Sequence, residues 1–189
     1  MTAHYSLMGE QKPVRLAEIL REVPSGYPVV EVGVYRGGSA LPLYQVTEER
    51  GEILHLFDTF EGIPFKDEID RDQQGDFDAR EVGGANAIQA LMPRSVLHIG
   101  IFPKTMPKFG LEMVSFVHSD CDQYRSVRAV IDTFWPRLVP GGVMAFDDMD
   151  TPGGEKAILE TFPNQFADGF HSMPPVHQHN MWWIVRKKG

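Results

Sequence analysis

With 189 residues, 42% of them hydrophobic, the chain is expected to fold as one domain over residues 1–189 around a single core. Its formal net charge of -8, without any basic run, argues against a nucleic-acid backbone as a partner, and no apolar stretch reaches the roughly 20 residues that cross a bilayer. The single cysteine excludes an internal disulfide and, with a polar start that is no signal peptide, indicates the cytoplasm.

The sequence from 12 to 39 predicts a helix, a strand and a turn that could bind a ligand. Residues 12–23 have apolar residues at helical spacing, and a short β-branched strand follows over 29–32. Glycines at 33, 37 and 38 then lead into a helix that starts at about Ser39. A strand, a glycine turn and a helix N-terminus offer free backbone N–H groups to a ligand. The turn is not a dinucleotide fingerprint, because Tyr35 stands where a second glycine is expected.

Two acidic residues near this turn are candidates for ligand binding. Glu31 lies inside the apolar strand, where a charge is costly unless a cation or hydrogen-bond donors pair with it. An ammonium-bearing ligand would supply that partner, and a neighbouring protein group is the structural alternative. Asp58 ends the next strand, over 53–57, where an acid can accept both hydroxyls of a ribose or cap the following segment.

The stretch from 61 to 84 is long, acidic and without apolar periodicity. Connections of this kind commonly cover a functional site, so we predict a mobile lid. The side chains most expected to touch a ligand are those of Phe65, Phe77, Arg80 and Val82. A short helix over 85–91 and a strand over 96–99 follow.

The centre of the chain predicts a βαβ unit: a strand over 114–118, a helix over 125–135, a Pro-Gly-Gly turn, and a strand over 143–146. Because the two strands of such a unit run parallel, their carboxyl ends meet at one edge of the sheet. A helix over 155–162 and two antiparallel closing strands, over 166–173 and 180–186, complete the chain.

Four carboxylates follow the two central strands: Asp120, Asp122, Asp147 and Asp148. Each alone could be a helix cap or a solvated turn residue. Together they repel one another unless a cation compensates, and open α/β sheets bind ligands at this edge. Oxygen ligands favour Mg2+, Mn2+ or Ca2+ over zinc. The acids beside Cys121 disfavour its thiolate, so we do not interpret it as a nucleophile.

Seven motifs, in order over nearly the whole chain from Val29, resemble the macrocin O-methyltransferase family. They are EVGVYRGGS (31–39), FDTFEGIP (57–64), GIFPKTMP (100–107), HSDCDQYRS (118–126), LVPGGVMAFDD (138–148), TPGGEKAI (151–158) and the final WWIVRKK. The resemblance implies a Rossmann-like class I methyltransferase fold: an α/β sheet of seven mostly parallel strands, with helices on both faces and a C-terminal antiparallel hairpin. It implies S-adenosylmethionine and Mg2+ as cofactors and a hydroxyl of a sugar or phenolic natural product as the acceptor.

Carried onto this sequence, the resemblance implies roles for individual residues. Asp120, Asp147 and Asp148 would bind the metal, and Asp122 would be the general base. The cofactor site would comprise Glu31 and Gly33 at the methionine part, Asp58 at the ribose, and Tyr35, Gly37, Ser39, Thr59, Phe60 and Asp120 around them. Gln123 stands where catechol-type relatives have a lysine, which excludes a lysine base at that position.

Other functions stay open at this point. A nicotinamide-dependent oxidoreductase would leave the Asp147–Asp148 pair without a role. A metal-dependent hydrolase could use the same acids but would not need Glu31 or Asp58, and a non-catalytic protein of the same fold has no evident reason to keep all four acids. The chain before the first strand is short, so the acceptor's identity does not carry over, and homo-oligomer formation is undecided.

Overall fold

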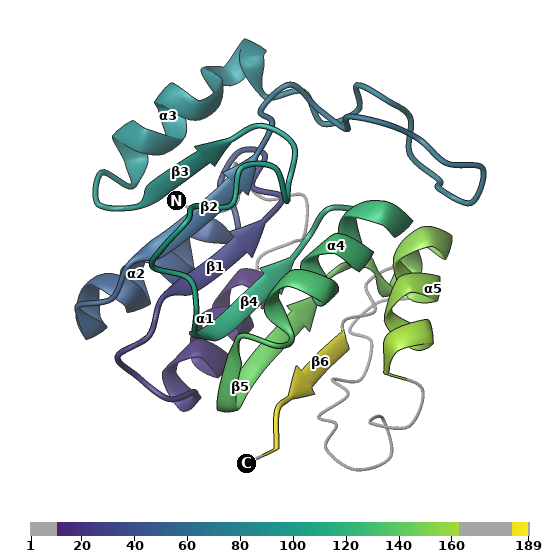
Figure 1. The fold of residues 1–189 in the computed structure, drawn as a ribbon. Helices are drawn as coiled ribbons and strands as arrows, with labels where there is room; N and C mark the ends of the chain where they lie inside the picture. The colour runs from purple at the N-terminus through teal and green to yellow at the C-terminus, as the bar shows by residue number, and fades with distance from the viewer. Residues whose placement is uncertain (1–10, 163–182, 189) are drawn as a thin grey trace.

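The fold is built around one β-sheet. A computed structural model describes residues 11–162 and 183–188, and within them six strands pair in the order β3-β2-β1-β4-β5-β6 (Figure 1). The first five strands are parallel, and β6 runs antiparallel to β5. The strands are β1 (Val29–Val32), β2 (Leu54–Asp58), β3 (Val96–Ile99), β4 (Val114–Ser119), β5 (Leu138–Phe146) and β6 (Trp183–Arg186).

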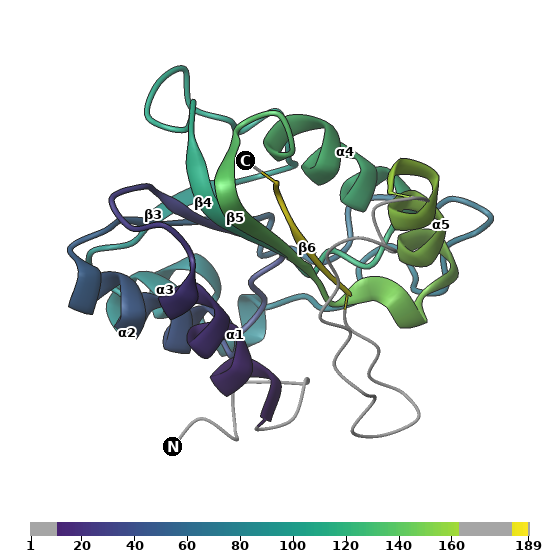
Figure 2. The ribbon, with the colours of Figure 1, turned by 90° about the horizontal axis from the view of Figure 1, so that it is seen from below.

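Helices cover both faces of the sheet (Figure 2). One face carries α1 (Gln11–Glu22), α2 (Ala40–Arg50) and α3 (Gly84–Leu91), and the other carries α4 (Tyr124–Phe134) and α5 (Pro152–Thr161). Two 3-10 turns, η1 (Arg80–Val82) and η2 (Asp148–Asp150), lie in the connections. In the described part of the chain, no helix has the length and apolarity needed to cross a bilayer.

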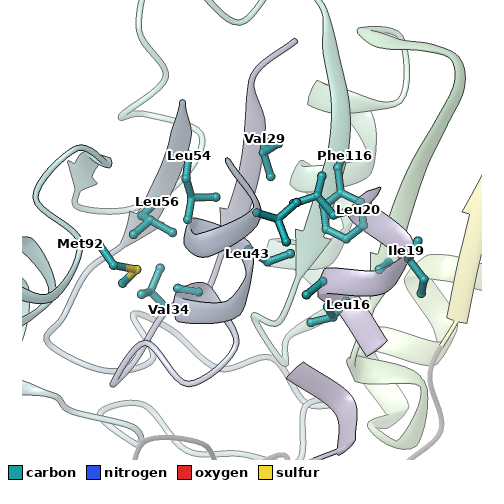
Figure 3. Packing of buried hydrophobic residues seen from close by; sticks show 14 of the residues in the cluster. Leu16, Ile19, Leu20, Val29, Val34, Leu43, Leu54, Leu56, Met92 and Phe116 are labelled. Carbon is teal, nitrogen blue, oxygen red and sulfur yellow. The ribbon is translucent and has the colours of Figure 1, made fainter. Parts of the chain in front are cut away.

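Each face buries its own apolar cluster. Figure 3 shows the cluster under α1 and α2, where Leu16 and Leu20 of α1 meet Leu43 of α2 and Phe116 of β4. On the opposite face, α4 presents four fully buried residues at helical spacing: Val127, Val130, Ile131 and Phe134. Each large apolar side chain buried in this way contributes about 1.5–3 kcal/mol, which fixes both helix layers on the sheet.

Two element boundaries differ from the prediction. The Pro-Gly-Gly segment is not a turn: β5 begins at Leu138 and runs through it, with a shift of register against β4. At Gly142 a Cβ would meet the backbone oxygens of Val139 and Ser115 at 2.8 and 2.9 Å, so glycine here permits close strand packing. Helix α5 begins three residues earlier than expected, because the Thr151 hydroxyl accepts a hydrogen bond from Gly154 N and caps it.

The remaining strands agree with the prediction where they can be compared. The closing strand is present as β6, whereas the partner expected over 166–173 falls outside the described residues. Parallel strands before an antiparallel closing strand are the arrangement expected from the sequence. The sheet therefore has the predicted edge, at which the carboxyl ends of β1, β2, β4 and β5 meet.

A histidine pair between β2 and β3 predicts acid sensitivity. His55 Nδ1 lies 2.9 Å from His98 Nε2, and His98 stacks on Phe57. Burial, with a contribution from His98, lowers the pKa of His55 to about 4, and burial also lowers the pKa of His98. Because these folded-state values lie below the unfolded value of 6.5, stability is retained above pH 6.5 and lost as the pH falls toward 4.

Calorimetric melting temperatures should therefore fall between pH 7 and pH 5. The fall should be shallower in His55→Gln, which removes the more strongly shifted group. An unchanged slope in this variant would assign the acid sensitivity to other groups.

Candidate functional site

A cavity of about 250 Å³ opens at the carboxyl edge of the sheet. It lies over the crevice between β1 and β4, where the strand order reverses, and open α/β sheets bind ligands at this place. Its lining combines the turn after β1, the end of β2 and the segments after β4 and β5. The lining residues are Val32, Gly33, Val34, Tyr35, Gly38, Ser39, Phe57, Asp58, Thr59, Gly62, Ile63, Pro64, Arg71, Phe77, Gly100, Ile101, Phe102, Asp120, Cys121, Asp122, Ser126, Asp147, Asp148 and Asp150.

The hydrogen-bond ladder of the sheet extends one residue beyond each of these strands. Gly33 N donates to Phe57 O, Asp120 N donates to Val32 O, and Asp147 N donates to Ser119 O, each over 2.9 Å. The residues that follow the strands are thereby held at neighbouring positions along the edge. This confirms that the central carboxylates and the glycine turn meet there.

Gly33 is required by the way β1 passes β4. Its φ is +88°, and a Cβ on it would lie 1.7 Å from the carbonyl oxygen of Asp120. A side chain at this position would need both a left-handed backbone and a separation of the two strands. The turn therefore brings the backbone of β1 directly against the first acid of the cluster.

Asp58 holds the same turn from the side of β2. Its Oδ2 accepts hydrogen bonds from Val34 N (2.6 Å) and Tyr35 N (2.8 Å), and its Oδ1 accepts one from Phe60 N (2.7 Å). Tyr35 and Phe60 both adopt positive φ, an uncommon conformation that these bonds help to hold. Asp58 thus lines the cavity and organises its wall, and its predicted contact with a ribose stays a prediction.

Glu31 does not line the cavity. It is fully buried, and its Oε1 accepts hydrogen bonds from Ser39 Oγ (2.5 Å) and from His118 Nδ1 (2.8 Å). The structural alternative for this residue, a pairing with neighbouring protein groups, is therefore present. Its other oxygen, Oε2, has no hydrogen-bond partner among the described residues. Glu31 reaches the cavity through Ser39, which does line it.

The central carboxylates influence one another strongly. Burial, followed by the charges of Asp147, Asp148 and Asp122, raises the pKa of Asp120 well above its usual value. Burial and the charges of Asp122 and Asp147 likewise raise the pKa of Asp148, whose Oδ2 accepts a hydrogen bond from Cys121 N at 3.2 Å. Four acids in one place favour a compensating positive charge.

Asp122 occupies a distinct position in this group. Its φ of +61° is uncommon for a non-glycine residue, and such conformations cluster at functional sites. Burial, with the charges of Asp72 and Asp147, raises its pKa to about 7, while Arg71 opposes the shift. Burial also raises the pKa of the Cys121 thiol, which agrees with the prediction that this cysteine is not a nucleophile.

A lysine from the N-terminal helix reaches the cluster. Lys12 Nζ lies 2.5 Å from Asp147 Oδ1, and the two side chains are only 12% and 18% exposed. This ion pair joins residues 135 positions apart, which no local sequence pattern could have indicated. One predicted metal ligand therefore already has a cationic partner.

The acids do not form a finished metal cage. Within residues 11–162 and 183–188, no three His, Cys, Asp or Glu side chains are arranged to hold a metal ion. The donor chemistry, carboxylate oxygens without nitrogen or sulfur, fits a hard divalent ion. Side-chain movement would have to accompany its binding.

The segment over 61–84 is attached to the start of α4. Arg125 forms an ion pair with Asp67, with Nε 2.5 Å from Oδ2, and the Gln123 side chain donates to the carbonyl oxygen of Phe65. Figure 1 shows the segment passing over the carboxyl edge of the sheet toward α4 and α5. It covers the site as predicted, whereas its mobility stays a prediction.

The residues predicted to touch a ligand divide into two groups. Those that line the cavity are Gly33, Tyr35, Ser39, Asp58, Thr59, Asp120, Asp122, Asp147, Asp148 and, from the covering segment, Phe77. Those placed elsewhere are Glu31, Gly37, Phe60, Phe65, Arg80 and Val82.

Val82 is exposed at the surface, and most of the other displaced residues have partners elsewhere. Gly37 lies where a Cβ would meet Ile88 of α3 at 2.9 Å, and Phe60 is 3% exposed in the core. Phe65 packs under Arg125, and Arg80 pairs with Asp78 on the surface.

Arg71 lines the cavity although no sequence motif indicated it. It is the only basic residue among the described residues that line the cavity, and its guanidinium lies 3.2 Å from Asp72 and 3.7 Å from Asp150. Its place in an acidic stretch of the sequence could have indicated these ion pairs, because one basic residue among many acidic ones commonly pairs with them.

Comparison with known proteins shows the family and the fold of the chain. A family profile described as a methyltransferase domain matches residues 30–149. The chain is 25% identical over 149 residues to mycinamicin III 3''-O-methyltransferase of Micromonospora griseorubida, covering 70% of this chain and 59% of that protein. It is 28% identical over 138 residues to a tetracenomycin-C 4'-O-methyltransferase of Streptomyces olivaceus that acts on a rhamnosyl derivative, covering 64% of this chain and 52% of that one. The chain thus spans little more than half the length of these relatives.

Solved structures show the same fold. The calicheamicin methyltransferase CalS11 superposes with a TM-score of 0.71 at 22% identity, covering 93% of this chain and 78% of that one. The O-methyltransferase NovP superposes with a TM-score of 0.73 at 18% identity, covering 98% and 83%. At these identities the likeness concerns the fold alone.

Proposed function

The chain belongs to a family of methyltransferase domains and has the Rossmann-like class I methyltransferase fold, and from this premise we propose that it is an S-adenosylmethionine-dependent O-methyltransferase. The proposed acceptor is a hydroxyl of a small molecule, a sugar or a phenolic natural product. One observation carries the proposal: a single cavity brings the Gly33 turn, Asp58 and the carboxylates of the β4 and β5 ends together. The motif resemblance to macrocin O-methyltransferases and the two curated relatives support this acceptor class.

The cofactor would lie along the wall formed by β1 and β2. Gly33 lets the backbone approach closely, Ser39 and Tyr35 stand on the turn, and Asp58 and Thr59 border the opposite side. Bound S-adenosylmethionine supplies a methyl group on a positively charged sulfur. Glu31 would act by holding Ser39, and the acidic lining suits a cationic ligand.

Asp122 is proposed to accept the acceptor's proton. A sugar or phenol hydroxyl is a weak nucleophile at neutral pH, so a nearby carboxylate that removes its proton accelerates methyl transfer. Asp122 lines the cavity beside the other acids, and the Asp122 backbone carbonyl accepts a hydrogen bond from the Thr151 hydroxyl at 3.0 Å. This bond ties the backbone just before α4 to the N-terminus of α5. The surrounding segment over 61–84 would exclude water.

The second part of the proposal is that the carboxylate cluster binds a divalent ion. Asp120, Asp147 and Asp148 would hold it, because their oxygens are the ligands that Mg2+ prefers and their mutual repulsion falls when a cation binds. When bound, the ion would lower the pKa of the acceptor hydroxyl and fix its orientation. The three acids come from the ends of β4 and β5, side by side in the sheet.

Binding of S-adenosylhomocysteine tests the proposed function. Calorimetry with the full chain should show one site per protein, because the reaction product occupies the same wall as the cofactor. Asp58→Asn should weaken binding about tenfold, because it removes the charge that holds the Val34 and Tyr35 amides. Asp76→Asn, a change of the same charge away from the cavity lining, is the control. Absence of binding in the wild type would favour a hydrolase or a non-catalytic protein.

Removal of divalent ions tests the metal separately. Treatment with EDTA should abolish methylation of a hydroxyl acceptor, and Mg2+ should restore it, because the acceptor hydroxyl would lose its acidifying partner. S-adenosylhomocysteine binding should persist through the same treatment. Activity that is unaffected by EDTA would remove the metal from the proposal while leaving methyl transfer intact.

A further inference from the structure

Lys12 is held in place by the core beneath its helix. It stands in the first turn of α1, which is anchored on the sheet by Leu16, Ile19 and Leu20, all at most 4% exposed. The position of the Lys12 ammonium beside Asp147 is therefore set by the packing of α1 on the sheet. Ion pairs that are largely removed from water couple more strongly than exposed ones.

The partner of Lys12, Asp147, is one of the four acids of the cluster. Asp147 comes directly after β5, its backbone N–H bonds to Ser119 O at 2.9 Å, and its side chain lines the cavity with Asp120 and Asp148. Asp147 is thus shared between the N-terminal helix and the proposed cation site. The Lys12 ammonium and a divalent cation would repel each other if both were bound to the Asp147 carboxylate, so each would weaken the binding of the other.

We propose that Lys12 is a displaceable internal counter-ion, whose ammonium competes with a divalent cation for Asp147. The inference rests on the proposed metal site and adds a residue to it: binding of the cation would break the 2.5 Å contact that joins the first turn of α1 to Asp147. In the absence of the cation, Lys12 would keep the acidic edge compact. It is a positioning residue, because it acts through Asp147.

Mn2+ binding to the full chain tests this inference, measured by the loss of the free-ion EPR signal without any substrate. Lys12→Met keeps the length of the side chain and removes the charge, and it should tighten Mn2+ binding about tenfold. Lys12→Arg should stay close to the wild type. The matched control is Arg21→Met, which removes one positive charge from the same helix at an exposed pair with Glu49, and it should change the affinity less than about twofold.

The Mn2+ and S-adenosylhomocysteine measurements distinguish failure of the Lys12 competition from failure of the proposed metal site or of methyl transfer. Equal or weaker Mn2+ binding in Lys12→Met than in the wild type would overturn the competition, provided that both proteins still bind S-adenosylhomocysteine. If neither protein binds Mn2+, both the competition and the metal site are wrong, while S-adenosylhomocysteine binding would still support methyl transfer. Tighter binding that appears equally in Arg21→Met would reduce the effect to net charge and also overturn the inference.

Discussion

Replacing Asp122 by asparagine should lower turnover by about a hundredfold or more, the usual contribution of a positioned general base. The amide keeps the size of the side chain and its backbone contact with Thr151, but it accepts no proton. Affinity for S-adenosylhomocysteine and for Mn2+ should remain close to that of the wild type. Single-turnover methylation assays, combined with calorimetry, measure these quantities independently.

Asp150→Asn serves as the control for this prediction. Asp150 also lines the cavity, but it is exposed and faces Arg71 at 3.7 Å, so its loss should cost much less activity. If Asp122→Asn instead abolishes Mn2+ binding and Asp120→Asn spares it, the roles of base and metal ligand are exchanged between the two residues.

Gly33→Ala should both destabilise the protein and strongly weaken cofactor binding. The new methyl would lie 1.7 Å from Asp120 O, so β1 and β4 must separate at the crevice where the cofactor is proposed to sit. The positive φ alone costs about 1–2 kcal/mol for a residue with a Cβ. We expect a clear fall in melting temperature and an affinity for S-adenosylhomocysteine lowered by about a hundredfold or more.

Gly26→Ala isolates the conformational part of this effect. Gly26 has a similar φ of +84°, but nothing lies within 4 Å of a Cβ placed on it. It should therefore lose stability modestly and keep its affinity for the ligand. Equal behaviour of the two variants would show that the contact at Gly33 is not needed by the site.

Much of the fold followed from periodicity. The helix predicted over 125–135 is present as α4, and the structure buries Val127, Val130, Ile131 and Phe134 on one of its faces. The convergence of the four acids followed from parallel strands alone. The start of β5 could not be predicted, because Pro140 and two glycines are typical of turns, and only the packing against β4 shows why they lie in a strand.

The candidate site was less predictable where distant segments meet. Glu31 was recognised as an expensive buried charge, but its pairing with His118 depends on the register of β1 against β4. Lys12 and Asp147 come together only because α1 packs where it does. Arg71 belongs to an irregular segment, whose side chains have no repeating pattern from which to infer direction.

Asp70 fixes one part of the covering segment to the start of α4. This buried carboxylate accepts hydrogen bonds from Tyr124 N and Asp67 N, both at 2.9 Å, and approaches Gly153 so closely that a Cβ there would lie 2.3 Å from it. Residues 65–70 are therefore part of the framework that positions the proposed base. Attempts to broaden acceptor scope by grafting or randomising this stretch would best be confined to 71–78, which leaves that junction intact.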